Sequence, residues 1–377
     1  LMPLAFAVES YSPHVNQSYP TNVYWGDTHL HSRLSTDSLY PNYGFNAIET
    51  LSPEEIYQFS RGEVITTKNG IKVRLNKALD FLVIADHSES IGALHALAIK
   101  DPLILKTQAG KFWYEKFWKI NENNSPEKVR SLIGESYFYF KKAFEDTAFR
   151  SSVWKQVIDN AERNNAPHKF TAFIGYEWSP TIAESPENGL GYMIHRVVIY
   201  KDGADKISKV LPFTGNDSKQ PEDLWAYLAN YQKVTGGEVI AIPHNANWSE
   251  GHMFQLQDSQ GNPFSQSYAK LRSRWEPLVE VTQMKGDSES HPMLSPTDEF
   301  SDFDTWSWLG SDDNDRKYEY TRSALKLGLQ EQAKLGVNPF KFGVIGSTDS
   351  HSSLPAIEEN NFLGKSAEPS KHRIAAD

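Results

Sequence analysis

The sequence predicts an α/β fold in which strands and helices alternate around a barrel. Several near-continuous apolar runs indicate strands covered on both faces, as in a parallel sheet wrapped by helices. Helix-start signals lie between these runs, which is the order of βα units. About seven such strands favour a barrel over an open sheet. With 377 residues, the chain is long enough for one large barrel or two smaller domains.

The predicted strands are short. Residues 22–25 are expected to form the first strand, because β-branched and aromatic residues are frequent there. The other strands are expected where apolar runs occur, at residues 80–85, 170–175, 195–200, 238–242, 278–282 and 342–346.

Helix-start signals separate these strands. Ser52 is a good N-cap, Pro53 suits the first helical position, and Glu55 completes a capping box three residues after the cap. A second helix is expected to begin within residues 220–225, and a third to cover residues 322–335.

Two connections are too long for plain barrel loops. Residues 95–165 carry an aromatic-rich helical pattern, which favours a helical insertion packed on the barrel over a membrane or ligand surface. Residues 249–320 are polar and rich in Ser, Asp, Gly and Pro, and are expected to form a long lid-like excursion. We therefore expect one barrel domain over residues 21–377 that contains both insertions.

Composition excludes several classes of protein. Lys and Arg number 38 against 48 Asp and Glu, and the net charge of −10 argues against general affinity for nucleic acid or anionic membranes. The absence of cysteine excludes disulfides, thiolate nucleophiles and zinc–thiolate sites, so His and carboxylates remain as strong metal ligands. We expect no membrane span. The sequence leaves the oligomeric state open.

The N-terminal stretch indicates export. Residues 1–20 read as the remnant of a signal peptide followed by an N-terminal arm, because apolar residues lead into the small-x-small pattern of Ala5-Phe6-Ala7. The positively charged start of a signal peptide is missing. We expect a periplasmic or secreted protein of bacterial type.

Histidines gather at the predicted strand ends. His29 and His31 are two residues apart, so in a strand they would point to one face, although a solvated surface pair would also explain them. Six of the twelve histidines lie at or beside predicted strand ends, where barrel enzymes place their chemistry. Together with three carboxylates they make nine candidate metal ligands: His29, His31, Asp37, His87, Glu177, His195, His244, Asp349 and His351.

These nitrogen and oxygen ligands suit two to three divalent ions of Zn, Mn or Fe, among which the sequence does not choose. The motifs also resemble those of a known family, in order GDTHLHS (26–32), ADHSE (85–89), GYEW (175–178), HRVVIY (195–200), PHN (243–245) and STDSH (347–351). The chain resembles the PHP superfamily (polymerase and histidinol phosphatase), in a bacterial branch catalogued as a domain of unknown function. The resemblance runs from about residue 22 to residue 365.

The resemblance implies a distorted (β/α)7 TIM-like barrel of PHP type and a trinuclear metal site that hydrolyses phosphoesters. It assigns the first metal to His29, His31, Glu177 and Asp349. In this assignment Glu177 bridges to a second metal, which His195 and His244 complete.

A third metal is assigned by the same resemblance to Asp37, His87 and His351, and Asp37 stands where many relatives have His. His195 begins its predicted strand instead of ending it, so its place in the set depends on the resemblance more than on the predicted strand.

Other polar residues adjoin the candidate ligands. Asp27, Asp86 and Glu89 are candidate acceptors that orient ligand imidazoles, although each would equally suit a strand-end cap or a surface acid. Candidates for binding an anionic substrate group share a place next to a ligand or a strand end, and are Arg33, Arg196, Asn245 and Lys285. Arg196 is expected to point away from its neighbour His195, and Lys285 would also suit a solvated loop.

The expected function is metal-dependent hydrolysis of a small phosphate ester by metal-activated hydroxide. Glu177, His244 and Asp349 are the candidate catalytic residues, with His244 or Asp349 protonating the leaving oxygen. One alternative is an amidohydrolase-like enzyme for C–N or C–O bonds, but such barrels usually use a carboxylated Lys where Glu177 stands here. A second alternative is a non-catalytic module stabilised by metals.

Overall fold

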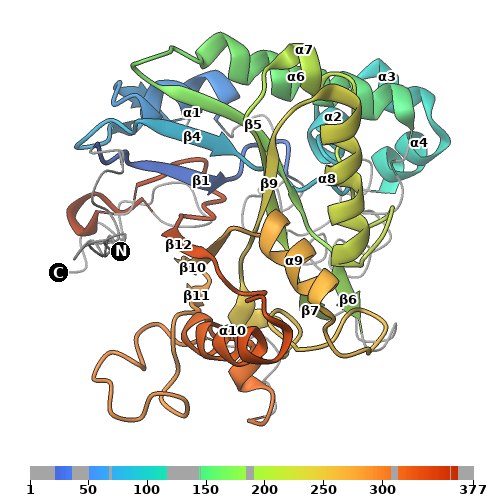
Figure 1. The fold of residues 1–377 in the computed structure, drawn as a ribbon. Helices are drawn as coiled ribbons and strands as arrows, with labels where there is room; N and C mark the ends of the chain where they lie inside the picture. The colour runs from blue at the N-terminus through green and yellow to red at the C-terminus, as the bar shows by residue number, and fades with distance from the viewer. Residues whose placement is uncertain are drawn as a thin grey trace, which may run out of the picture.

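The computed structural model shows a mixed α/β protein whose main sheet curls into a half-barrel (Figure 1). It describes residues 22–35, 51–67, 70–116, 144, 146–183, 191–306, 313–356 and 358–363. Two sequence-based expectations, the N-terminal arm at residues 1–20 and the candidate ligand Asp37, lie outside the described residues.

The main sheet has five strands in the order β1-β4-β5-β8-β9. These strands are β1 (Gly26–Leu30), β4 (Phe81–Ile84), β5 (Thr171–Trp178), β8 (Arg196–Tyr200) and β9 (Val239–Pro243). The first three run parallel, whereas β8 is antiparallel to both β5 and β9. The expectation of an all-parallel sheet is therefore wrong at β8.

The connection between β5 and β8 explains this reversal. Strands β6 (Thr181–Ala183) and β7 (Gly191–Met193) pair with each other directly after β5, so the chain turns back without a crossover helix. Parallel neighbours need a crossover of a dozen or more residues, while antiparallel neighbours need only a turn. The amino end of β8 consequently meets the carboxyl end of β5.

A second sheet continues the curl. It pairs β10 (Leu278–Gln283) in parallel with β12 (Gly343–Gly346) and antiparallel with β11 (Gly286–Asp287). Strand β10 contacts β9, and a single parallel bridge joins Leu30 of β1 to Ser350. Among the described residues, the ladders therefore form two adjoining sheets instead of one closed barrel.

The first strand begins later than the sequence suggested. Val23, Tyr24 and Trp25 are exposed, and β1 starts at Gly26 and runs through the first histidine. Glycine is required at this start because a Cβ atom on Gly26 would lie 2.4 Å from the carbonyl oxygen of Phe81. The prediction of a strand over residues 22–25 relied on aromatic and β-branched content and placed the strand too early. The start of β1 is instead determined by where the chain comes close enough to pair with β4.

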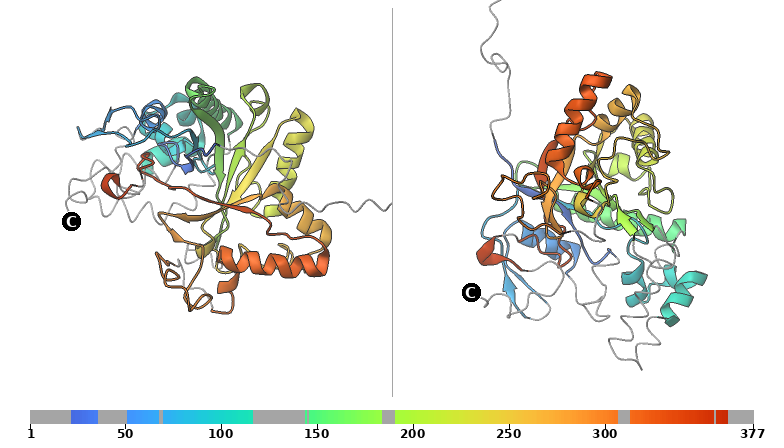
Figure 2. Two further views of the ribbon diagram at one scale, coloured as in Figure 1. Left: turned by 60° about the vertical axis from the view of Figure 1, so that its left-hand side comes forward. Right: turned by 90° about the horizontal axis from the view of Figure 1, so that it is seen from below.

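The described residues form helices around the sheets (Figures 1 and 2). They are α1 (Pro53–Ser60), α2 (Ala93–Ala98), α3 (Pro102–Lys106), α4 (Gln108–Tyr114), α6 (Thr147–Asn164), α7 (Ala204–Ile207), α8 (Pro221–Thr235), α9 (Gln266–Trp275) and α10 (Thr321–Leu335). Of these, α6 packs against β5, and α8 and α9 pack against β9. The capping box of Ser52 and Glu55 forms as predicted, because each side chain bonds the other's backbone N–H. The helices predicted within residues 220–225 and over 322–335 are confirmed as α8 and α10.

Short elements complete the described chain. They are β2 (Ile65–Thr66), β3 (Lys72–Val73) and the 3-10 turns η3 (Ala246–Trp248), η4 (Arg316–Tyr318) and η5 (Glu359–Asn361). No helix among the described residues has the length and apolar character needed to cross a membrane.

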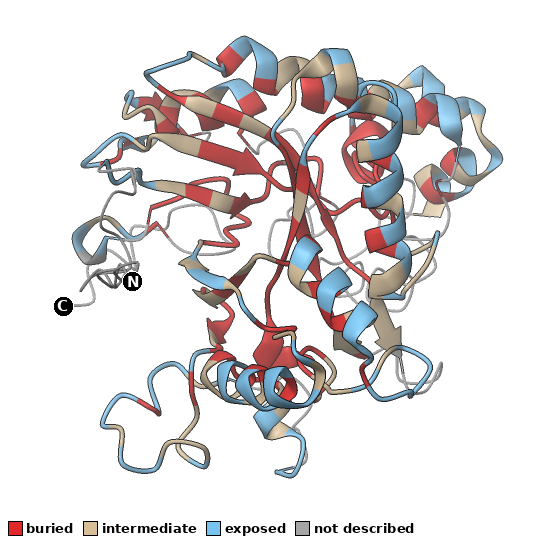
Figure 3. Ribbon diagram, in the orientation of Figure 1, coloured by how far each residue is buried: buried red, intermediate tan, exposed pale blue. Residues whose placement is uncertain are grey.

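The two long connections contain regular structure. Within residues 95–165, Trp113 of α4 and Trp154 of α6 are buried in the main core, while Phe112 is exposed. Residues 249–320 include α9, β10 and β11, so this stretch contributes to the second sheet and is not one continuous lid. Burial is greatest where the strands converge (Figure 3).

Candidate metal centre

Six strands, β1, β4, β5, β8, β9 and β12, carry eight of the nine predicted ligands at or beside their ends and bring them to one buried place. Each of the eight residues is less than 9% exposed, and they are His29, His31, His87, Glu177, His195, His244, Asp349 and His351. His195 joins them because β8 is reversed. The register pairs Trp178 with Arg196, so the residue before Arg196 lies beside the carboxyl end of β5.

Four donor atoms converge at the centre of this cluster. His31 Nε2 lies 3.3 Å from His29 Nε2, 3.0 Å from Asp349 Oδ1 and 3.4 Å from Glu177 Oε2. His29 Nε2 lies 3.6 Å from both of those carboxylate oxygens. Donors held tetrahedrally about 2.05 Å from one ion are about 3.3 Å apart, so the spacing fits a single divalent metal.

Glu177 joins this group to its neighbours. Its Oε1 lies 2.8 Å from His195 Nδ1 and 2.8 Å from His244 Nε2, and its Oε2 lies 2.9 Å from His87 Nδ1. Four groups of three side chains bring their ligand atoms within 4.8 Å of one another: His29/His31/Glu177, His87/Glu177/His195, His31/His87/His351 and His29/His244/Glu280. The cluster is therefore large enough for more than one ion.

Burial and nearby carboxylates have opposite effects on the pKa values of the imidazoles. Burial lowers the pKa of His244 and, despite the nearby carboxylate of Glu177, lowers that of His195 to about 3. At His29 burial also lowers the pKa, but the carboxylates of Glu280 and Asp349 raise it well above its usual value. Burial alone would raise the pKa of Glu177, but His87 and His244 hold it well below its usual range. Neutral imidazole and ionised carboxylate are the forms that bind metals.

Two ring nitrogens test whether the cluster fits metal ions. Within the described part of the chain, His195 Nε2 and His244 Nδ1 are buried and have no hydrogen-bond partner. Buried polar atoms are almost always satisfied, so an unpaired imidazole nitrogen needs a proton donor or a metal. The donor set of nitrogen and oxygen without sulfur suits Zn, Mn or Fe.

Glu280 is the functional candidate that sequence reasoning missed. Its Oε2 lies 3.0 Å from His29 Nδ1, and the residue is 1% exposed in the middle of β10. The only sequence signal was a lone acid inside the apolar run Leu278-Val279-Glu280-Val281. Two serine hydroxyl groups also contact ring nitrogens of the cluster: Ser35 Oγ lies 2.7 Å from His31 Nδ1, and Ser179 Oγ contacts His87 Nδ1.

The three predicted imidazole acceptors bind backbone and hydroxyl groups instead. Asp27 accepts the backbone N–H of His29 at 2.9 Å and the hydroxyl of Thr348 at 2.6 Å. Asp86 accepts both the N–H and the hydroxyl of Ser32, each at 2.7 Å. Burial raises the pKa of Asp27 to about 6.

Glu89, the third predicted acceptor, accepts the N–H of Ser179 at 3.2 Å. All three acids therefore fix the loops that carry the ligands, whereas Glu280 orients an imidazole directly.

The predicted substrate-binding residues divide into two groups. Lys285 is buried, pairs with Asp349 and lies 5.7 Å from the ring centroid of Trp248, so it is not a solvated loop residue. Asn245 follows His244 with a left-handed φ of 55° and accepts a hydrogen bond from Gln283.

Arg33 is half-buried and lies two residues from His31. Arg196 points to the opposite side of β8, where its Nε donates to Glu276 Oε1 at 3.0 Å. Arg196 therefore does not join the histidine cluster, and a buried carboxylate already binds it.

Fold and site together define a mixed α/β protein with a buried histidine–carboxylate centre that can hold metal. The family model described as "Protein of unknown function (DUF3604)" matches residues 18–376, and the chain belongs to that family. No curated protein and no solved structure matches the chain.

Proposed function

We propose that this protein is a metal-dependent hydrolase of phosphate esters that uses two to three divalent ions. The observation that supports this most is the convergence of His29, His31, Glu177 and Asp349 donors at 3.0 to 3.6 Å. When bound, such ions polarise phosphate oxygens and lower the pKa of water.

The proposed ligand sets follow the contacts of Glu177. The first ion is bound by His29, His31, Glu177 and Asp349, and the second by Glu177, His195 and His244. His87 and His351 contribute to a third, for which Asp37 is the remaining candidate. The motif order that resembles the PHP superfamily supports this assignment and the finer fold, a distorted (β/α)7 barrel built from β1, β4, β5, β8, β9, β10 and β12.

Three side chains are proposed to bind the anionic part of the substrate. Lys285 brings a buried ammonium group to Asp349. Asn245 Nδ2 and Arg33 Nε are buried donors with no hydrogen-bond partner among the described residues, which supports their use by a ligand. His244 and Asp349 lie within the cluster, where either can hold the proton that the leaving oxygen requires.

The contacts of Glu177 favour phosphoesters over C–N or C–O bonds. An amidohydrolase-type site would place a carboxylated lysine between two ions, whereas here a glutamate with five imidazoles around it is the candidate for that position. A purely structural metal module is disfavoured because it would leave two donor atoms, Asn245 Nδ2 and Arg33 Nε, buried without a hydrogen-bond partner among the described residues.

Elemental mass spectrometry on protein purified without chelator or affinity metal tests the centre first. We expect about two to three equivalents of Zn, Mn or Fe per chain. Less than one equivalent, unchanged after incubation with each metal, would contradict the proposal.

Phosphomonoester and phosphodiester panels then test the reaction. Glu177→Gln should abolish turnover, while Glu331→Gln, a buried carboxylate on α10 that pairs with Lys334, should retain it. If the protein contains its full metal complement but hydrolyses none of these esters, the proposed metal centre is supported and the proposed phosphoesterase activity is refuted.

A further inference from the structure

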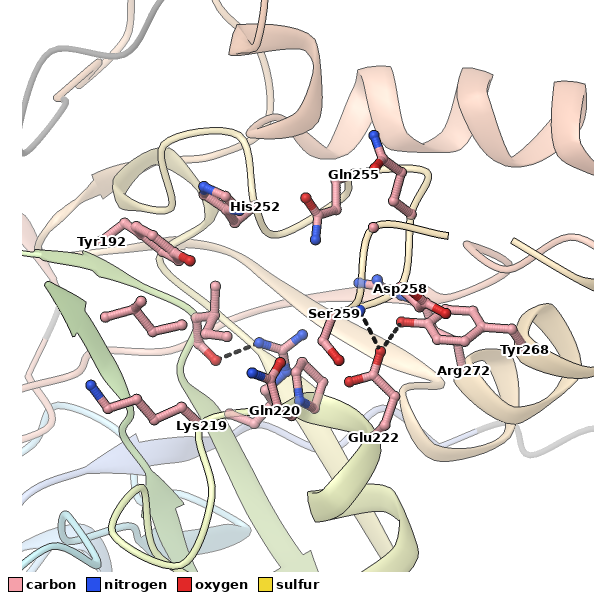
Figure 4. Close-up of a pocket in the computed structure, with 16 residues that line it drawn as sticks. Tyr192, Lys219, Gln220, Glu222, His252, Gln255, Asp258, Ser259, Tyr268 and Arg272 are labelled. Carbon is pink, nitrogen blue, oxygen red and sulfur yellow. Dashed lines mark hydrogen bonds between the residues drawn. The ribbon is translucent and has the colours of Figure 1, made fainter. Parts of the chain in front are cut away.

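A second polar site lies on the opposite side of β8 from the histidine cluster. A cavity of about 330 Å³ opens between the β6–β7 hairpin, the start of α8 and α9 (Figure 4). Its polar lining includes Tyr192, Arg196, Lys219, Glu222, Tyr268 and Arg272. Successive residues of a strand point to opposite faces, so Arg196 faces away from the cluster that His195 joins.

Two buried guanidinium groups share one carboxylate at this cavity. Arg196 and Arg272 are 1% and 4% exposed. Glu276 Oε1 accepts from Arg196 Nε at 3.0 Å, and Glu276 Oε2 lies 3.2 Å from Arg272 Nη2. One positive charge is therefore left without a counter-charge in this group, which is costly for buried ions.

Hydrogen-bond donors also remain at this end of the cavity. Arg196 uses Nε for Glu276 and Nη1 for the carbonyl of Ile194, and Arg272 uses Nη2 for the carbonyl of Met253 at 2.7 Å. None of these hydrogen bonds uses Arg196 Nη2 or Arg272 Nη1. Guanidinium groups bind carboxylate and phosphate oxygens through such paired donors.

An acceptor lies on another wall of the cavity. Glu222 Oε1 accepts the hydroxyl of Tyr268 at 2.9 Å and the N–H of Ser259 at 3.0 Å. Its Oε2 is buried and has no hydrogen-bond partner in the part of the chain that the structure describes. This oxygen suits a hydroxyl or amino group on the same ligand that the arginines bind.

We propose that this cavity binds a small carboxylate or phosphate anion that also carries a hydroxyl or amino group. The anion contacts Arg196 and Arg272, and the donor group contacts Glu222. The volume suits a small molecule, since ligand sites begin at roughly 300 Å³. This binding is separate from metal-dependent hydrolysis and does not require it.

Calorimetric titration of the metal-loaded protein tests this with two probes, glycerate and 2-hydroxyethylphosphonate. Neither probe contains a phosphoester bond, so turnover cannot contribute heat. Tighter binding of glycerate assigns the site to carboxylates, and tighter binding of the phosphonate assigns it to phosphates. Saturable binding of either probe supports an anion site, which the variants then place at the cavity or elsewhere, and absence of saturable binding by both probes overturns the proposal.

Variants locate the binding. Arg272→Gln removes one guanidinium and should weaken binding about tenfold or more. Ser259→Trp fills the cavity from an exposed loop position and should weaken it at least as much, which keeps the test valid if the arginine variant does not fold.

Gln260→Trp, the matched control in the same loop, should bind as the wild type does. Unchanged affinity in Ser259→Trp would overturn the proposal. Loss of binding in His244→Ala would also overturn it, because the probes would then be bound at the histidine cluster.

Discussion

His195 and Arg196 are neighbours in the chain, are buried to the same degree, and belong to two very different environments. His195 faces imidazoles and carboxylates that all present electron pairs to one point. Arg196 faces a carboxylate and an indole N–H in a group where Glu276 Oε1 accepts from both Arg196 and Trp225. The first environment presents ligand atoms that could hold a cation, and the second already contains two guanidinium groups and the carboxylate that they share.

This difference separates two uses of buried polar groups. Around Glu276 the chain supplies both signs of charge, so the polar network holds α8, α9 and β8 together. Around Glu177 it supplies imidazole nitrogens at 2.8 to 3.6 Å from the carboxylate oxygens. A cluster of the second kind is stable in a low-dielectric interior only when positive charge is added. Four changes test that distinction.

The largest expected effect is on stability at the arginine side. Glu276→Gln removes the carboxylate shared by two buried guanidinium groups and should lower the free energy of unfolding by about 3 to 5 kcal/mol. Urea denaturation measures this, and metal content should not change. Glu238→Gln, which breaks an exposed pair with Lys201, is the matched control and should cost less than about 1 kcal/mol. Equal costs for the two variants would contradict the comparison.

Metal removal should have the next largest effect, on the opposite side of β8. Ions present at 100 to 1,000 times their dissociation constant stabilise a folded protein by about 2.7 to 4.1 kcal/mol. Chelation should therefore lower the melting temperature, and added metal should restore it. Chelation should lower the melting temperature of the Glu276→Gln variant by the same amount, although this variant melts at a lower temperature before chelation. An unchanged melting temperature after verified metal loss would refute a buried metal centre.

Glu280→Gln should weaken metal binding about 10- to 100-fold, because it removes the charged partner of His29 Nδ1. Competition with a chelator of known affinity gives the measurement. Asp27→Asn is the comparison, since Asp27 contacts the backbone of His29 and not its ring. A larger loss of affinity for Asp27→Asn than for Glu280→Gln would reverse the roles assigned to these acids.

The smallest effect is expected at Ser35, whose hydroxyl lies 2.7 Å from His31 Nδ1 and accepts the N–H of His87 at 3.0 Å. Ser35→Ala should reduce stability by about 0.5 to 1.5 kcal/mol, the net worth of an ordinary hydrogen bond. Thermal unfolding in the presence of metal measures it. A loss as large as that of Glu276→Gln would show that the two sides of β8 depend equally on their polar contacts.

Local patterns in the sequence predicted what depends on local physics. The capping box at Ser52 and Glu55 needs only residues three apart, and it forms. Strand-end histidines were found because strands with buried ends bring neighbouring termini together. The start of β1 at Gly26 was missed because it depends on close approach to Phe81, a residue far away in the sequence.

Long-range pairing explains the other differences. Glu280 looked like one polar residue in an apolar strand until β10 was seen beside His29. The reversal of β8 follows from the β6–β7 hairpin. Neither the composition nor the periodicity of the sequence predicts that these two strands pair. The same reversal explains how His195, which precedes its strand, reaches residues that follow theirs.

The reversed strand has a consequence for how this protein can diversify. Trp178 and Arg196 are paired in register, so the chain leaves and re-enters the sheet at one point. Insertions between them can change in length without moving Glu177 or His195, as loops in a hairpin can. Ile182 of β6 and Tyr192 of β7 also line the cavity that contains Arg196 and Arg272. Changes in this hairpin can therefore alter what the cavity binds while the histidine–carboxylate centre stays constant.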